Sequence, residues 1–152
     1  MPITIRTTPQ PGDLGYMTYL HGILYDFGQG FENYVATSLA EFFETYDPTK
    51  ERVWMAEDQG QIVGHLVLKN TEGWAQLRYF LIRPEYRGMG LGKRLMQEFL
   101  EFFQACGYQK SFLLTTDGLD TAVHLYERYG YRLANSRTMD IGITEHRFEL
   151  FA

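Results

Sequence analysis

The residues with the clearest chemical potential lie in the stretch RPEYRGMGLGKRL, residues 83–95. Three glycines alternate with other residues, and a cation stands on each side of them, at Arg87 and Lys93. A turn that opens a helix presents backbone N–H groups without intrahelical partners, and the helix dipole adds partial positive charge there. Because glycine has no Cβ, an anion can approach those N–H groups closely. The stretch therefore predicts a site for a phosphate or pyrophosphate.

Two well-known phosphate-binding motifs do not fit these residues. A dinucleotide motif G-x-G-x-x-G beginning at Gly88 needs a glycine where Lys93 stands. A P-loop ending at Lys93 needs Ser or Thr next, and that residue is Arg94. One alternative stays open, in which the glycines only let a strand and a helix pack closely.

The elements around this turn follow from apolar periodicity and turn residues. Helices are predicted over residues 14–24, 31–46, 91–107 and 119–130, and strands over residues 3–7, 52–58, 61–70, 74–82, 110–116, 131–140 and 142–151. The order β-α-α-β-β-β-α-β-α-β-β predicts an α/β (α+β) fold with a mixed, mostly antiparallel twisted sheet flanked by helices. We expect a single domain over residues 1–152, because this length suits one domain.

Composition excludes several function classes. The net charge of −5 argues against a nucleic-acid surface, which needs a basic stripe. No apolar run is long enough for a membrane helix, and the N-terminus has no signal-peptide pattern, so we expect a cytoplasmic protein without a membrane partner. The lone cysteine, Cys106, is expected to be buried and inert, and the histidines lack metal-ligand spacing, so no metal is expected.

Two motifs together resemble the GNAT N-acetyltransferase superfamily. The stretch LIRPEYRGMGLGKRL matches its R/Q-x-x-G-x-G/A acetyl-CoA motif, with Arg87, Gly90 and Gly92 at the defining positions. The stretch AVHLYERYGYRL is similar to a second block of the superfamily, with Tyr131 in place of the usual Phe. The chain also resembles, more narrowly, the acetyltransferase half of bacterial proteins that fuse this domain to a MarR-type regulator.

This resemblance implies an acetyl-CoA-dependent N-acetyltransferase of the GNAT acyl-CoA N-acyltransferase fold. Its acceptor would be a primary amine of a small molecule or peptide, acetylated by direct transfer in a ternary complex. A non-catalytic acyl-CoA-binding or sensor module of the same fold is the alternative, and a purely structural protein is a third hypothesis. A homodimer is expected by analogy.

The resemblance also implies which residues bind the cofactor. The backbone of one strand end would pair with the pantetheine arm across a V-shaped gap beside the strand at residues 110–116. The strand-end residues are Phe80, Leu81 and Ile82, and the pyrophosphate-binding residues are Arg87, Gly88, Met89, Gly90, Leu91, Gly92 and Lys93.

For catalysis, the resemblance implies that Tyr126 is the general acid beside the cofactor sulfur. A phenol keeps its proton at neutral pH, since its pKa is about 10. The alternative is a core tyrosine on the apolar helix face. No residue is singled out as the general base, and the four acids considered are Asp26, Glu32, Glu57 and Glu72. Relatives often carry Asn where Leu119 stands. The hydrogen bond that this Asn makes to the cofactor is therefore missing here or is made by another residue, for which Thr116 is a candidate.

The acceptor side is expected in the loop between the first two helices. Tyr25, Phe27 and Glu32 are the expected substrate-binding residues there, and His21 lies just before the loop. The acidic balance favours a cationic amine, but the sequence does not decide between metabolite, antibiotic, polyamine and protein N-terminus.

Overall fold

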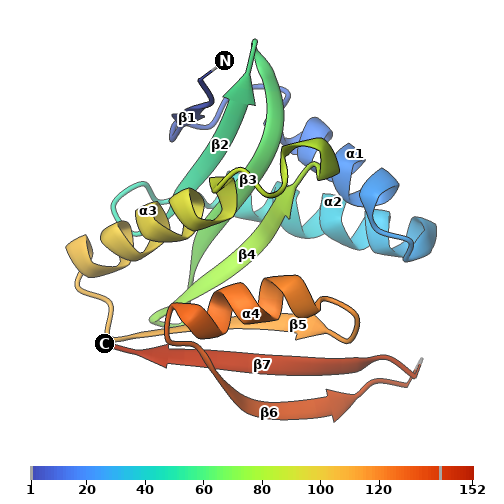
Figure 1. Cartoon of the computed structure of the whole chain (residues 1–152), viewed down its shortest axis with the longest axis vertical. Coiled ribbons are helices and arrows are strands. Elements are labelled where there is room, and N and C mark those ends of the chain that lie inside the picture. Colours follow the sequence, from blue (N-terminus) through green and yellow to red (C-terminus); the bar gives the residue numbers. More distant parts are fainter. Residues whose placement is uncertain (1, 141) are drawn as a thin grey trace.

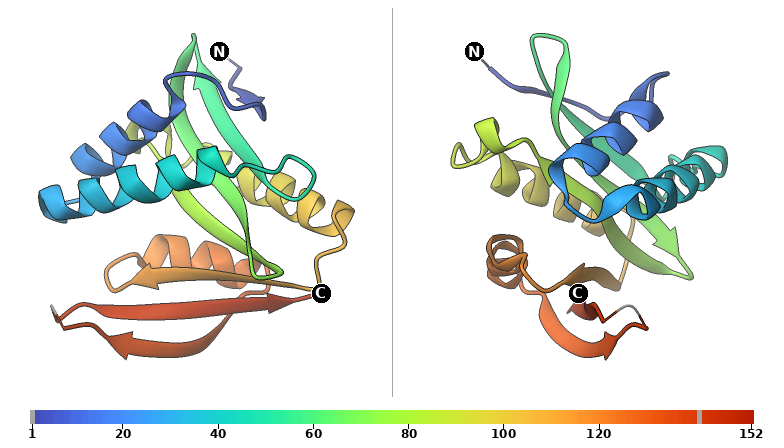
Figure 2. Two further views of the ribbon diagram at one scale, coloured as in Figure 1. Left: turned by 180° about the vertical axis from the view of Figure 1, so that it is seen from behind. Right: turned by 90° about the vertical axis from the view of Figure 1, so that its right-hand side faces the viewer.

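The computed structural model describes residues 2–140 and 142–152 and contains one seven-stranded sheet with helices on both faces (Figure 1). The strands are β1 (Thr4–Arg6), β2 (Arg52–Asp58), β3 (Gln61–Thr71), β4 (Trp74–Ile82), β5 (Lys110–Thr116), β6 (Arg132–Thr138) and β7 (Thr144–Phe151). The helices are α1 (Asp13–Leu24), α2 (Gly28–Glu44), α3 (Leu91–Ala105) and α4 (Asp120–Arg128), with a 3₁₀ turn at Pro84–Tyr86. Helices α1 and α2 lie on one side of the sheet and α3 and α4 on the other (Figure 2).

The predicted fold class and element order are confirmed. The largest difference is at α2, which begins at Gly28 rather than at residue 31, so the connection from α1 is only three residues long. Gly28 and Gly30 therefore belong to the helix and not to the loop that their residue type predicts. The ring of Phe31, whose centroid lies 5.8 Å from that of Tyr25, anchors this first turn against the end of α1 and offsets the poor helix propensity of glycine.

The strands run in the order β1-β2-β3-β4-β5-β7-β6, and only β4 and β5 are parallel neighbours. These two strands pair at just two positions, Ala75 with Ser111 and Gln76 with Phe112. The buried hydroxyl of Ser111 strengthens this junction, because it donates to the Ala75 carbonyl at 2.6 Å and shares a 2.7 Å hydrogen bond with Tyr131. Beyond Gln76 the strands separate, which leaves the second half of β4 without a partner on that side.

A β-bulge in β4 lies beside this separation. Between the pairs Val67 with Arg78 and His65 with Leu81, the single residue Leu66 faces both Tyr79 and Phe80. Tyr79 adopts the left-handed conformation, with φ of 54°, which is uncommon for a residue with a side chain. A bulge bends its strand and increases the local twist. It therefore helps to turn the end of β4 away from β5.

Two apolar clusters fix the helices to the sheet. Phe99 and Leu95 of α3 pack with Trp54 on one face, while Leu39 and Phe42 of α2 pack on the other. Among the described residues, no helix combines the length and the apolar character that a membrane crossing needs.

Candidate active site

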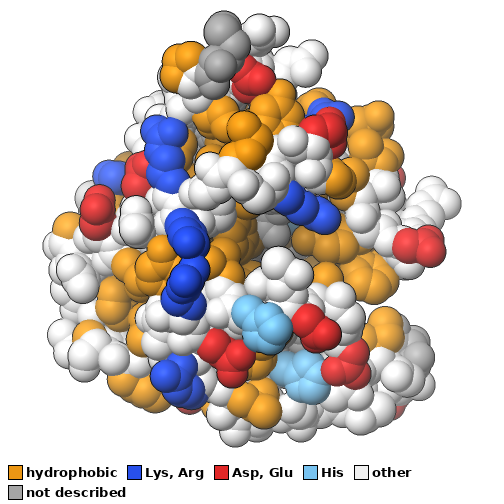
Figure 3. All heavy atoms as spheres, viewed as in Figure 1, with side chains coloured by type: hydrophobic (Ala, Val, Ile, Leu, Met, Phe, Trp, Pro, Cys, Tyr) orange, Lys and Arg blue, Asp and Glu red, His pale blue; other side chains and the backbone are white. Residues whose placement is uncertain are grey.

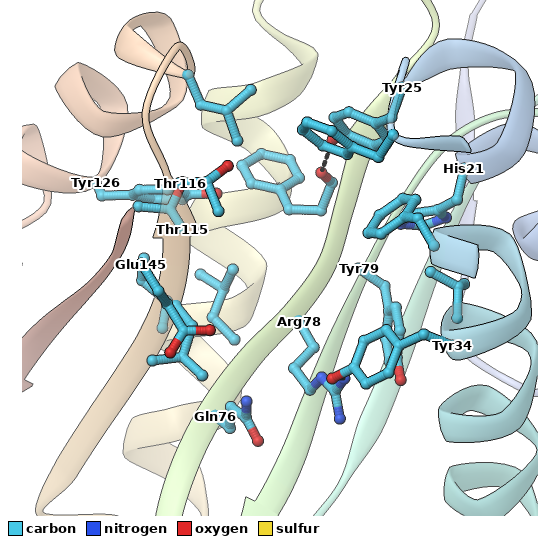
Figure 4. Close-up of a pocket in the computed structure, with 18 residues that line it drawn as sticks. His21, Tyr25, Tyr34, Gln76, Arg78, Tyr79, Thr115, Thr116, Tyr126 and Glu145 are labelled. Carbon is cyan, nitrogen blue, oxygen red and sulfur yellow. Dashed lines mark hydrogen bonds between the residues drawn. The ribbon is translucent and has the colours of Figure 1, made fainter. Parts of the chain in front are cut away.

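A cavity of about 250 Å³ opens where β4 and β5 separate (Figure 4). Residues from α1, α2, β4, β5, α4 and β7 line it, so it connects the two helical layers through the gap in the sheet. In Figure 3 the face that carries α3 and α4 is hollowed near its centre, with Lys and Arg side chains around the hollow. Both faces of the sheet therefore contribute residues to the walls of the cavity.

Tyr126 reaches the cavity from α4, as Figure 4 shows. Its side chain is 7% exposed and packs between the rings of Phe80 and Tyr131, at centroid distances of 6.1 and 6.2 Å. Burial raises the pKa of Tyr126 far above its ordinary value, and the nearby Tyr25 and Tyr131 raise it further. The phenol is therefore protonated throughout the neutral pH range and can donate its proton inside the cavity.

The glycine turn lies at the start of α3. Gly88 and Gly90 both have positive φ, at 76° and 82°, and Gly90 is the residue immediately before the helix. A Cβ at either position would meet nothing within 4 Å, so their conformation and not their packing requires glycine. Arg87, Met89 and Lys93 are at least partly exposed around them, and the first buried side chain of the helix is Leu91. The turn thus has backbone N–H groups that are free at the start of a helix, two glycines with positive φ, and two exposed cations beside open space.

Gly92 differs from the other two glycines. A Cβ there would lie 3.3 Å from a methyl of Leu125, 3.5 Å from Ile82 and 3.8 Å from the ring of Phe80. Close packing of α3 against α4 and the end of β4 therefore explains Gly92 but not Gly88 or Gly90. Phe80 also lines the cavity. Gly92 therefore lies between the glycine turn and the wall of the cavity.

The strand end predicted to bind the pantetheine arm follows the bulge. Leu81 is buried and pairs with His65 of β3, while Phe80 and Ile82 are half-buried. Two side chains donate long hydrogen bonds to carbonyls of this strand, Tyr25 to Phe80 at 3.5 Å and Arg87 to Ile82 at 3.2 Å. Phe80 and Ile82 pair with no residue of β5, so an extended ligand can bind their backbone groups by replacing these two side-chain contacts.

An aromatic wall closes the cavity on the α1–α2 side. The rings of Tyr25 and Phe27 stack 5.8 Å apart, and Phe31 packs edge-on to both. His21, 5% exposed, completes this wall, and its Nδ1–H donates to the Met17 carbonyl at 2.8 Å. Burial lowers the pKa of His21 and the charge of Arg78 lowers it further, although the Met17 carbonyl opposes this, so the imidazole is neutral.

Three residues with a charged or amide side chain that sequence reasoning did not single out also line the cavity. Gln76 and Arg78 come from β4 and Glu145 from β7, and Figure 4 shows them on opposite sides of the space. Glu145 pairs with Thr116 across β5 and β7, and it is the only carboxylate among the described cavity-lining residues. Nothing in the sequence links these residues, because β7 lies far from β4 along the chain and returns to its neighbourhood only in the folded sheet.

The acids considered as general bases lie elsewhere. Glu57 forms a 3.3 Å ion pair with Arg6, Glu72 occupies the β3–β4 turn, and Asp26 lies in the α1–α2 connection without lining the cavity. Glu32 does not line the cavity, and its carboxylate lies against Gly22 of α1, where a Cβ would clash with it. Of the three expected substrate-binding residues, the structure brings Tyr25 and Phe27 to the cavity and leaves Glu32 outside it.

Three further residues named from the sequence have clear positions in the structure. Leu119 and Thr116 line the cavity beside Tyr126. Cys106, expected to be buried, is only half-buried, because it lies at the end of α3 with its sulfur 3.5 Å from the Thr49 carbonyl. Among the described residues, no group of three His, Cys, Asp or Glu side chains has an arrangement that could hold a metal ion.

Comparison with known proteins agrees with this architecture. The acetyltransferase (GNAT) family matches residues 20–131, which include the glycine turn and Tyr126. The chain is 29% identical over 136 residues to an uncharacterised N-acetyltransferase of Schizosaccharomyces pombe, covering 86% of this chain and 83% of that protein. It is 32% identical over 125 residues to N-acetyltransferase 8 of Rattus norvegicus, covering 75% of this chain and 56% of that protein.

Solved structures show the same fold. A GNAT-family acetyltransferase of Desulfovibrio desulfuricans superposes with a TM-score of 0.81 at 16% identity, covering 99% of both chains. A GNAT-family acetyltransferase of Elizabethkingia anophelis, solved with acetyl-CoA bound, superposes with a TM-score of 0.69 at 16% identity, covering 99% of this chain and 98% of the other.

Proposed function

The chain belongs to the acetyltransferase (GNAT) family, and from that membership we propose that it transfers the acetyl group of acetyl-CoA to a primary amine. The acceptor is the amine of a small molecule or peptide, and transfer is direct, within a ternary complex. The observation that carries the proposal is the cavity at the separation of β4 and β5, with Tyr126 on its wall and the glycine turn beside it.

The residues at the glycine turn fit the pyrophosphate of a coenzyme A. Open space lies in front of Gly88 and Gly90, where a Cβ would meet no atom, and Arg87 and Lys93 supply positive charge. Backbone N–H groups at the start of α3 are directed at this space. The acetyl-CoA bound in the Elizabethkingia anophelis protein supports the same ligand for this chain. Phe80, Leu81 and Ile82 would bind the pantetheine arm through the backbone edge of β4 that faces the gap and has no β5 partner.

Acetyl-CoA supplies a thioester, whose carbonyl carbon is open to attack by a neutral amine. In our proposal Glu145 accepts the proton that the amine loses, because it is the carboxylate of the cavity. The nitrogen lone pair then forms the amide C–N bond as the C–S bond breaks. The nitrogen loses its second proton in this step to Glu145, which has passed the first proton to solvent. The hydroxyl of Tyr126 donates its proton to the departing sulfur and is reprotonated from solvent.

Burial of Tyr126 does not prevent that donation. A phenol is ordinarily a weaker acid than a thiol, and burial raises the pKa of Tyr126 further. The same low-polarity surroundings also penalise a thiolate, which raises the pKa of the leaving group as well. Burial therefore widens the difference in acidity between the two groups less than the shift of Tyr126 alone would.

The alternative function is an acyl-CoA-binding module without catalysis. Two measurements separate it from the enzyme. Acetyl-CoA at 100 times its dissociation constant should stabilise the folded protein by about 2.7 kcal/mol in either case, seen as a raised Tm. Free CoA thiol should accumulate only when a panel of primary amines is added to the enzyme. Stabilisation without thiol release would support the module, and absence of stabilisation would reject both.

A further inference from the structure

Arg78 is a cation without a carboxylate partner among the described residues. Its guanidinium donates to the Tyr34 hydroxyl at 3.0 Å and lies over the ring of Tyr79, 4.6 Å from the centroid, and it makes no ion pair in the described part of the chain. The residue is not fully buried, and both it and Tyr34 line the cavity. A positive charge held in this way is ready to pair with an anion that comes from outside the chain.

Gln76 presents a second donor beside Arg78. The two residues are two positions apart in β4, before the bulge, so their side chains project from the same face of the strand. The Gln76 oxygen accepts a 2.8 Å hydrogen bond from the Thr71 hydroxyl, which fixes the amide with its NH₂ group free of that contact. A guanidinium and an amide on one face make a donor set that suits a carboxylate.

Glu145 faces this donor set from the other side of the gap. One of its oxygens accepts from Arg137 at 2.9 Å, and the side chain lines the cavity next to Thr116 and Tyr126 (Figure 4). The cavity thus has an anion on the side of Tyr126 and a cation with an amide on the side of α2. An acceptor that carries both an ammonium and a carboxylate matches the charges of the two walls.

We propose that the acceptor is a free α-amino acid, whose carboxylate binds Arg78 and Gln76 and whose ammonium binds Glu145. In this orientation the nitrogen lies on the side of the cavity that carries Tyr126. The aromatic wall of Tyr25, Phe27 and Phe31 provides an apolar surface for the amino-acid side chain, which favours apolar over charged side chains. This inference rests on the proposed acetyl transfer for its reaction, but its binding part does not depend on turnover.

The test compares acceptors that differ only in the carboxylate. L-phenylalanine, phenylalanine amide and 2-phenylethylamine are titrated calorimetrically into the protein in complex with CoA, and each is then assayed with acetyl-CoA. We expect phenylalanine to bind and react better than both analogues, on the order of 10- to 100-fold in affinity and in kcat/KM, the cost of losing hydrogen bonds to a charged group. Equal binding of phenylalanine and 2-phenylethylamine would overturn the inference.

Variants assign that preference to Arg78. Arg78→Met keeps much of the length of the side chain but removes the charge, and should abolish the preference for phenylalanine over 2-phenylethylamine. Tyr34→Phe removes only the hydroxyl that orients the guanidinium, and should weaken the preference partially. Lys50→Gln removes one exposed positive charge that does not line the cavity and should leave the preference unchanged. An unchanged preference in Arg78→Met, with a Tm near that of wild type, would overturn the assignment.

The two proposals fail in different ways. If phenylalanine binds with dependence on Arg78 but no amine in the panel is acetylated, the acetyl-transfer function is overturned and the amino-acid site stands. If amines without a carboxylate are acetylated as well as phenylalanine, the function stands and the amino-acid site is overturned.

Discussion

The Nδ1 atom of His65 lies 2.6 Å from the carbonyl oxygen of Tyr79, inside the sheet and out of contact with solvent. Since a carbonyl only accepts, the Nδ1–H of His65 is the donor. The bond holds the one residue of β4 that has a positive φ, at the centre of the bulge. The other ring nitrogen, Nε2, is buried without a hydrogen-bond partner among the described residues. His65 therefore supports the strand distortion that opens the cavity.

Replacing His65 should weaken the site as well as the fold. His65→Leu leaves the Tyr79 carbonyl unsatisfied, which costs about 1–3 kcal/mol of unfolding free energy in urea denaturation. Relaxation of the bulge should also reduce the affinity for acetyl-CoA. His65→Asn keeps an N–H near the Nδ1 position and should retain that affinity better, despite a comparable loss of packing. Equal acetyl-CoA affinity in His65→Leu and wild type would show that the bulge does not depend on this bond.

The stability of the protein should decrease as the pH falls below about 6.5, the ordinary pKa of histidine. Burial, with a smaller contribution from the neighbouring His21, lowers the pKa of His65 to about 3, against the opposing effect of the Tyr79 carbonyl. The unfolded chain therefore binds a proton at His65 that the folded chain does not accept until the pH is near 3. Each such proton reduces the unfolding free energy by about 1.4 kcal/mol per pH unit.

His65→Asn isolates that contribution. Between pH 6 and pH 5, before most carboxylates titrate, the unfolding free energy of this variant should fall less steeply than that of wild type, by a slope of up to one proton. His21, whose pKa is also lowered, should maintain part of the slope in both proteins. If the unfolding free energies of the variant and of wild type fell in parallel with pH, His65 would be taking up its proton in the folded state.

Tyr126→Phe should lower kcat by about 10²- to 10⁴-fold, the usual contribution of a positioned proton donor, with little change in the KM for acetyl-CoA. The ring remains to pack against Phe80 and Tyr131, so the Tm should change little. Tyr129→Phe is the matched control, because its hydroxyl donates a long 3.4 Å bond to the Lys93 carbonyl and does not line the cavity. Unchanged turnover in Tyr126→Phe would remove this residue from the mechanism.

Gly90→Ala should reduce acetyl-CoA affinity more than it reduces stability. An alanine at a φ of 82° costs about 1–2 kcal/mol in backbone strain and moves the N–H groups that open α3. Gly60→Ala is the control, since Gly60 has a φ of 81°, lies in the β2–β3 hairpin and has the same open space for a Cβ. The two variants should have similar Tm values, and isothermal titration should show weaker acetyl-CoA binding only for Gly90→Ala. Weaker acetyl-CoA binding in both variants would indicate global destabilisation and not a local effect at the turn.

Glu145→Gln should lower kcat/KM for the amine by at least about 10²-fold, because the amide is no base and attracts no ammonium. Raising the pH, which deprotonates the free amine, should recover part of the lost rate. Glu149→Gln on the same strand is the control, since Glu149 pairs with Arg147 at 2.7 Å and does not line the cavity. Equal rates for the two variants would exclude Glu145 as the proton acceptor.

The parts of the site that local sequence specifies could be predicted, and those that depend on sheet register could not. Gly88, Gly90 and Arg87 are neighbours in the chain, and the geometry of their turn follows from residue type alone. The same cavity is lined by Arg78, Gln76 and Glu145 only because β7 lies between β5 and β6 and because β4 separates from β5. Both features are long-range.

The bulge in β4 could not be predicted for a related reason. Its sequence, RYFL, has no glycine to indicate a left-handed residue, and the partner that stabilises Tyr79 is His65 on the neighbouring strand. A histidine in the middle of an apolar strand is the one available signal, because a buried polar ring needs a hydrogen-bond partner. That signal does not say which backbone group the ring binds, so it gives no position for the bulge.

The two-residue junction between β4 and β5 also bears on how the molecule opens. Hydrogen exchange of the ligand-free protein should reveal β5, β6, β7 and α4 as a cooperative unit with its own opening equilibrium, because so few backbone bonds tie that unit to β4. A cofactor that occupies the gap would add bonds to both sides and join the two units into one. Slower amide exchange on both sides of the gap, and not only at the residues in contact, would then be the signature of a filled site.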